Sequence, residues 1–189
     1  MELFIVDKVV ELEEMDRRLS AARLFGHKEI LLLFTKHDKD NQSIIRALNE
    51  KSRGFVSAIL AKDQNQARSL RKQYGAVLAP PRRDMVECKA VTHIFNPEQQ
   101  PRQDFIHHRN SGMNQVLLKL CKAHGKELVT TLSVLGAQPT VILGRMMQNA
   151  RWCRKYKVPY HMTSGARTLW EQRDADCLRA LERELLSQR

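Results

Sequence analysis

The run of residues 107–119 combines cationic, amide and glycine residues directly before an amphipathic segment. Its letters, HHRNSGMNQVLLK, place Arg109 and Asn110 ahead of Ser111, a residue type that often caps a helix start. Free backbone N–H groups in the first turn of a helix, together with the positive end of its dipole, favour a bound anion. Arg109 adds a bidentate donor for phosphate, and Gly112 allows a ligand to approach the backbone closely. The run therefore predicts an anion-binding site.

Two other turns carry similar residues. Pro-Arg-Arg occupies positions 81–83, and Ser-Gly-Ala-Arg occupies positions 164–167. Each turn follows a short apolar run and precedes a predicted helix. In a barrel, all three turns would lie at the carboxyl ends of strands, where functional loops gather. We expect them to present donors to one nucleic-acid backbone, with Ser164 and Gly165 among the contacts.

The charge of the chain supports a polyanionic partner. Its 189 residues include 32 Lys and Arg against 21 Asp and Glu, a net charge of +11. Such an excess favours nucleic acid first and an anionic membrane second. Aromatic residues make up only 6% of the chain, which favours phosphate contacts over base stacking. The densest basic run, residues 151–157, places Arg151 on an exposed helix face. We expect its aromatic residues, Trp152 and Tyr156, to pack inward. A later aromatic residue, Trp170, is expected in the core or over a barrel end.

A hydrolytic alternative depends on three residues. Asp7 follows the first predicted strand, and His93 and His161 lie within later ones. If they converged, they could hold zinc, manganese or iron for a metal-dependent phosphoesterase on a shortened barrel. The chain has no G-x-S-x-G, P-loop or H-E-x-x-H motif, so no nucleophile or catalytic base stands out. Nucleic-acid binding, the hypothesis that the charge favours, needs no catalytic residue, metal or cofactor in the protein itself.

The cysteines indicate the compartment. They are widely spaced and form no C-x-x-C pair, which argues against a zinc framework: Cys88, Cys121, Cys153 and Cys177. Without a pattern of a secretory signal, they predict reduced core thiols in a cytoplasmic protein. No apolar run approaches the ~20 residues that span a bilayer, so we expect no membrane partner.

Short apolar runs alternate with amphipathic segments along the whole chain. The predicted strands are 3–6, 29–34, 55–61, 76–79, 92–95, 127–132 and 159–163. The predicted helices are 11–25, 41–51, 63–74, 84–89, 112–124, 139–156 and 174–187. This alternation is typical of βαβ units with a parallel sheet, either open or closed into a barrel. The even repeat and the missing G-x-G-x-x-G favour an α/β TIM-barrel-like fold with about seven parallel strands in one domain, 1–189, because eight-fold barrels typically need ~250 residues.

Residues 109–119 resemble the central motif of the ribonuclease P protein component 3 family, the archaeal counterpart of the eukaryotic thirty-kilodalton subunit. The sequences RKYKVP at 154–159 and TSGA at 163–166, then Trp170 and Arg173, continue the resemblance in the order and spacing of that family. It covers roughly residues 105–180, whereas the first half agrees mainly in its strand–helix rhythm.

The resemblance implies a metal-free barrel-like domain that supports a catalytic RNA. That RNA removes the 5′ leader from precursor tRNA and uses Mg²⁺ for the hydrolysis. The family pairs with a second small protein subunit, and the pair assembles as a heterotetramer on the RNA. The contacts with RNA or a partner subunit that it implies are Arg109, Asn110, Asn114, Lys119, Arg151, Ser164, Gly165 and Arg173, and the anion-binding site predicted above adds Ser111 and Gly112.

Overall fold

A computed structural model describes residues 1–7, 11–51, 54–101, 103–136 and 138–187, without the side chains of residues 51 and 186. Within these ranges the strands are β1 (Glu2–Val6), β2 (Ile30–Phe34), β3 (Val56–Leu60), β4 (Ala76–Ala79), β5 (His93–Phe95), β6 (Glu127–Thr131) and β7 (Tyr160–Thr163). The helices are α1 (Leu12–Leu24), α2 (Lys39–Lys51), α3 (Gln64–Leu70), α4 (Arg83–Glu87), α5 (Gln115–Ala123), α6 (Pro139–Tyr156) and α7 (Ala175–Ser187). Short 3-10 helices are η1 (Pro97–Gln99), η2 (Leu132–Val134) and η3 (Leu169–Glu171).

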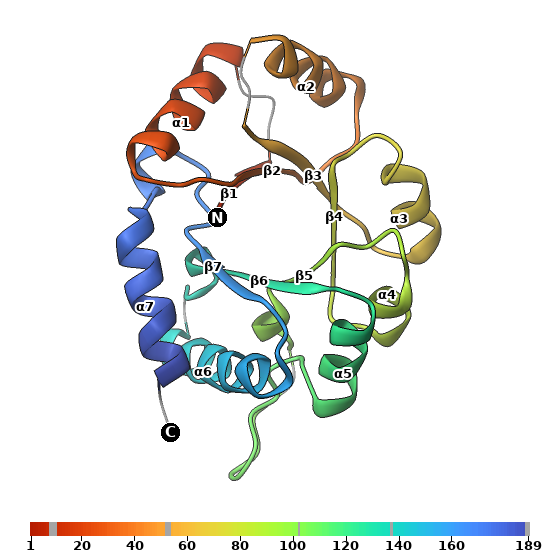
Figure 1. Cartoon of the computed structure of the whole chain (residues 1–189), viewed down its shortest axis with the longest axis vertical. Coiled ribbons are helices and arrows are strands. Elements are labelled where there is room, and N and C mark those ends of the chain that lie inside the picture. Colours follow the sequence, from red (N-terminus) through yellow and green to blue (C-terminus); the bar gives the residue numbers. More distant parts are fainter. Residues whose placement is uncertain (8–10, 52–53, 102, 137, 188–189) are drawn as a thin grey trace.

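The strands form one parallel sheet in the order β1 to β7, with the helices around it (Figure 1). The sheet returns to its start, because Phe4 of β1 makes a parallel bridge with Ala166, just beyond β7. The backbone N–H of Ile5 donates to the Ala166 carbonyl at 2.9 Å. This single bridge nearly closes a seven-stranded barrel, as predicted, and the strand order excludes an open doubly wound sheet.

Most strands are buried on both faces, β1, β2 and β4 over their whole length, which explains the continuous apolar runs in the sequence. In β1, Leu3 and Ile5 belong to a small cluster inside the barrel. Phe4 and Val6 point the other way, into the larger cluster shared with the helices. The structure thus has an inner core filled by strand side chains and an outer core between strands and helices.

Several predictions of burial and length were wrong. Cys177 is exposed, whereas the other three cysteines are buried. Trp170 is 89% exposed, so of its two predicted places the core is excluded. The helix predicted over 63–74 ends at Leu70, where a tight turn follows in which the backbone N–H of Gln73 donates to the Leu70 carbonyl at 2.9 Å. Across the described residues, no helix has both the length and the apolar character needed to cross a bilayer.

Candidate nucleic-acid interface

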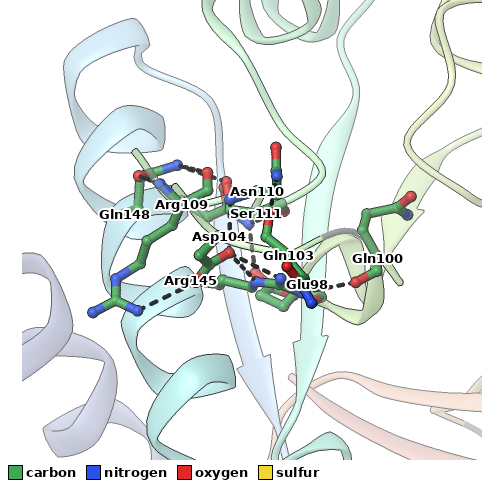
Figure 2. Close-up of polar contacts among 10 residues, drawn as sticks. Glu98, Gln100, Gln103, Asp104, Arg109, Asn110, Ser111, Arg145 and Gln148 are labelled. Atoms are coloured by element: carbon green, nitrogen blue, oxygen red, sulfur yellow. Dashed lines mark hydrogen bonds and ion pairs between the residues drawn. The ribbon is translucent and has the colours of Figure 1, made fainter. Parts of the chain in front are cut away.

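Helix α6 holds the loop that follows β5, and Figure 2 shows the contacts. The Arg145 side chain, only 5% exposed, donates to the Glu98 carbonyl at 2.9 Å and the Gln100 carbonyl at 2.8 Å. One turn on, Gln148 exchanges hydrogen bonds with the backbone of Arg109 at 3.3 and 2.9 Å. These polar residues lie beside the buried apolar face of α6, so their tertiary role could not be read from helical periodicity.

A buried carboxyl group lies at the base of this loop. Glu98 is fully buried, and both of its carboxyl oxygens lie within 3.1 Å of the Thr130 hydroxyl. Asn149 donates to Glu98 at 2.8 Å and to the Ser111 carbonyl at 3.0 Å. Burial raises the pKa of Glu98 to about 7, although these hydrogen bonds act in the opposite direction. Glu98 and Asn149 therefore join both ends of the loop to the barrel.

Asp104 organises the outer part of the loop. One carboxylate oxygen accepts from Arg145 at 2.9 Å and from the Asn110 backbone N–H at 2.8 Å. The other lies 3.3 Å from the Arg109 guanidinium. Partial burial alone would raise the pKa of Asp104, but the Asn110 N–H and the two guanidinium groups lower it below its ordinary value. The carboxylate is thus ionised and holds Arg109 in place.

Ser111 does not cap a helix, which corrects the prediction from the sequence. Helix α5 begins at Gln115, and its cap is Asn114, whose side chain accepts from the Leu117 N–H at 2.9 Å. Ser111 is buried and accepts a hydrogen bond from Gln148. Gly112 has a φ of +78°, and a Cβ there would lie 2.1 Å from the Pro97 carbonyl oxygen. A glycine at position 112 is therefore required by the positive φ and by the close approach of the Pro97 backbone, and not by a ligand.

Two of the three predicted turns share one cleft of about 350 Å³, here called the α5 cleft. Pro81 and Arg82 form one wall, and His108 together with residues 110–114 forms the other. The Arg82 guanidinium forms an ion pair with the Asp84 carboxylate at 2.5 Å. The α5 cleft is lined by Pro81, Arg82, Gln100, His108, Asn110, Ser111, Gly112, Met113, Asn114 and Leu117.

A second cleft of about 380 Å³ lies on the other side of the same loop, against α6. We call it the α6 groove, and it is lined by His107, His108, Arg109, Gly144, Met147, Gln148, Arg151 and Trp152. Trp152 is half-buried against the outer core, as predicted. His108 stacks on its indole ring, with centroids 5.7 Å apart and an interplanar angle of 26°. His108 borders both clefts, so two concave surfaces meet at its ring.

The third predicted turn faces inward. The Ser164 hydroxyl is buried and donates to Glu2. Gly165 has a φ of +66°, and a Cβ there would lie 2.5 Å from the Thr131 side chain. Arg167 extends from the same turn and pairs with Asp7 at 2.6 Å. Ser164 and Gly165 therefore pack against the chain's own strands, and neither lines the two clefts described above.

Two further predicted contacts lie apart from the clefts. Lys119 is exposed on α5 and lines neither of them. Arg173 donates to the carbonyl oxygens of Trp170 and Gln172, and its own carbonyl contacts His27 just beyond α1. Because α1 and α5 lie on opposite sides of the ring, Arg173 is remote from the α5 cleft (Figure 1).

The residues of the hydrolytic alternative do not converge. Asp7 lies beyond the carboxyl end of β1, whereas His93 begins β5 and His161 lies near the start of β7. Both histidines instead face Glu127, at 3.6 and 2.9 Å. In the ranges that the structure describes, no group of three or more His, Cys, Asp and Glu side chains is arranged to hold a metal ion. The convergence that the hydrolytic alternative required is therefore not found.

Comparisons with known proteins find similarity at the level of the fold. No family model and no curated protein matches the chain. Among solved structures, it is similar to a chain in the cryo-EM structure of an archaeal ribonuclease P with mature tRNA. That match has a TM-score of 0.75 and 16% identity, and it covers 98% of this chain and 83% of the other. A phospho-2-dehydro-3-deoxyheptonate aldolase from Thermotoga maritima matches with a TM-score of 0.45 and 8% identity, over 98% of this chain and 68% of the aldolase.

Proposed function

We propose that this protein is an RNA-binding subunit of a ribonuclease P ribonucleoprotein. The observation that carries the proposal is the similarity of nearly the whole chain to a chain of archaeal ribonuclease P, at a TM-score of 0.75. The net charge of +11 and the two clefts around residues 103–114 are consistent with it. In this role the protein neutralises phosphates and orders the RNA, and the RNA cleaves the 5′ leader of precursor tRNA with Mg²⁺.

The arrangement of side chains suits binding more than hydrolysis. Arg109 and Arg151 lie beside one groove, and amide groups of Asn110 and Asn114 line the neighbouring cleft. Guanidinium and amide groups donate hydrogen bonds to phosphate and ribose oxygens. Precursor tRNA and a second small protein subunit, in a heterotetramer, are the further partners that we propose.

Co-purification tests the assignment directly. The tagged protein is isolated from its source cells at low salt, and the bound RNA is sequenced. We expect enrichment of the ribonuclease P RNA and of precursor tRNA, together with a small protein. Recovery of the protein without enriched RNA would contradict the proposal, as would stoichiometric metal with phosphodiesterase activity that needs no RNA.

A salt titration tests the mode of binding. If phosphate contacts dominate, log affinity falls linearly with log salt, with a slope of about −0.7 to −0.9 for each phosphate contact. The measurement uses the transcribed ribonuclease P RNA at constant Mg²⁺. A slope near zero would show that charge neutralisation contributes little to the complex.

A further inference from the structure

The α6 groove contains a flat aromatic surface that is fixed from behind. His108 is exposed, and one face of its ring rests on Trp152, 5.7 Å away between centroids. Trp152 is held against the outer core, so the pair is positioned before any ligand arrives. Because His108 is exposed and borders both clefts, the second face of its imidazole is the one that a ligand can reach. Nucleobases stack on such faces regardless of sequence, because every base has a π-face.

Two guanidinium groups lie beside this surface. The Arg109 side chain is 47% exposed and lies flat on α6, since a Cβ on Gly144 would be 2.4 Å from its Cζ. Asp104 holds the same guanidinium at 3.3 Å. Arg151, two turns beyond Gly144, lines the groove as well. Of the residues that the structure describes, no Asp or Glu lines this groove, so its walls attract an anion.

The loop that follows β5 also carries an apolar tip, Phe105 and Ile106. Phe105 and Ile106 are 69% and 96% exposed. The backbone groups of Phe105 and His108 bond to each other at 2.8 and 3.4 Å, which closes a tight turn. In Figure 1 this light-green loop extends away from the ring below α5 and α6. Exposed apolar side chains flanked by cations are suited to insertion between bases, whose phosphates then meet the cations.

We propose that the α6 groove and this tip form a binding site for unpaired RNA nucleotides. A base stacks on the open face of His108, the adjoining phosphate binds Arg109 and Arg151, and a neighbouring base contacts Phe105. The groove volume of about 380 Å³ lies at the small end of ligand sites, which suits one nucleotide. A duplex does not fit this description, because its bases stack on one another and hide their faces. The proposal rests on the proposed function and names the part of the RNA that is recognised.

Fluorescence anisotropy with the whole chain tests the site. The probes are fluorescein-labelled decauridine and a labelled ten-base-pair RNA duplex at the same ionic strength. We expect tighter binding of decauridine, and roughly tenfold weaker binding of it by His108→Ala, the usual effect of losing one stacked base. Arg151→Ala should also reduce the salt slope by about 0.7. Arg46→Ala, an exposed arginine on α2 across the ring, removes the same charge and should change affinity less than twofold.

Gly144→Ala is a second variant that keeps every charge. Its methyl group would displace the Arg109 guanidinium from α6, so we expect at least fivefold weaker binding of decauridine with an unchanged circular dichroism spectrum. Equal effects of Arg46→Ala and Arg151→Ala would overturn the site, as would unchanged binding by His108→Ala and Gly144→Ala.

The outcomes separate this proposal from the proposed function. If the wild-type protein binds ribonuclease P RNA but the groove variants bind it equally well, the groove proposal fails alone. If the wild type enriches no RNA, the proposed function fails. Phe105→Ser with full affinity for decauridine, but loss of a co-purifying protein, would assign the tip to a protein partner and refute its contact with bases.

Discussion

The anchoring of the loop by Arg145 makes a quantitative prediction. Arg145→Met keeps an unbranched apolar stem but removes the guanidinium. That group donates to the Asp104 carboxylate and to the carbonyl groups of Glu98 and Gln100, at 2.8 to 2.9 Å. Because Arg145 is 5% exposed, water cannot replace these bonds without local opening.

The expected loss follows from these contacts. Removing one partner of a buried ion pair costs about 3–5 kcal/mol. Asp104 is 17% exposed and retains Arg109 and the Asn110 N–H, which favours the lower end of that range. We therefore expect the free energy of unfolding to fall by about 3 kcal/mol. With a urea dependence of about 2 kcal/mol per molar, the midpoint moves by ~1.5 M.

Urea denaturation followed by circular dichroism measures this change. Arg46→Met on α2 is the matched control, since that arginine is exposed and the loss should stay below ~0.5 kcal/mol. Hydrogen exchange should also accelerate at the amides of residues 103–111 in the Arg145 variant. A loss below about 1 kcal/mol with an unchanged urea slope would refute the reasoning, because the buried contacts would then contribute no more than a surface pair.

Three further predictions concern single groups around the same loop. Asn114→Ala should cost about 1 kcal/mol by uncapping α5, and urea melts that show no loss of stability in this variant would argue against that cap. Gly144→Ala should leave the free energy of unfolding unchanged or raise it by up to ~1 kcal/mol, because alanine has the higher helix propensity but the contact of Arg109 with α6 is lost. A large loss of stability would show that the Arg109 side chain cannot move aside. The folded-state pKa of Glu98, about 7, lies above its ordinary value of 4.5, so its contribution to stability is complete below pH 4.5 and is lost as pH rises through 7. Glu98→Gln should flatten the fall in stability between about pH 5 and pH 8, and an equal fall in both proteins would contradict the assignment.

The barrel was predictable because its strands are buried on both sides. Runs such as 30–34 remain apolar over every position, and amphipathic segments between them require parallel pairing. Closure of the barrel was harder to predict from the sequence, since it depends on one bridge between Phe4 and Ala166, two residues that are 162 positions apart. Helix boundaries failed where two caps competed: Ser111 and Asn114 are equally suitable residue types, and only packing selects Asn114.

The candidate site was predicted in part. Arg109, Asn110 and Asn114 were identified from residue type and spacing, and they line adjoining clefts in the structure. Arg145 and Asn149 were missed, because a polar residue beside the apolar face of a helix looks like an ordinary surface residue. Their signal exists only in combination with the loop that they bind.

The sequence by itself determined the alternation of strands and helices, the positive charge and the group of donors after the fifth strand. These properties are local, since they follow from the period of apolar residues and from residue type. Only the tertiary structure decided which donors face outward. It buried Ser164 against Glu2, packed Gly165 against Thr131 and joined His108 to Trp152, because side chains far apart in the chain compete for the same space and hydrogen-bond partners.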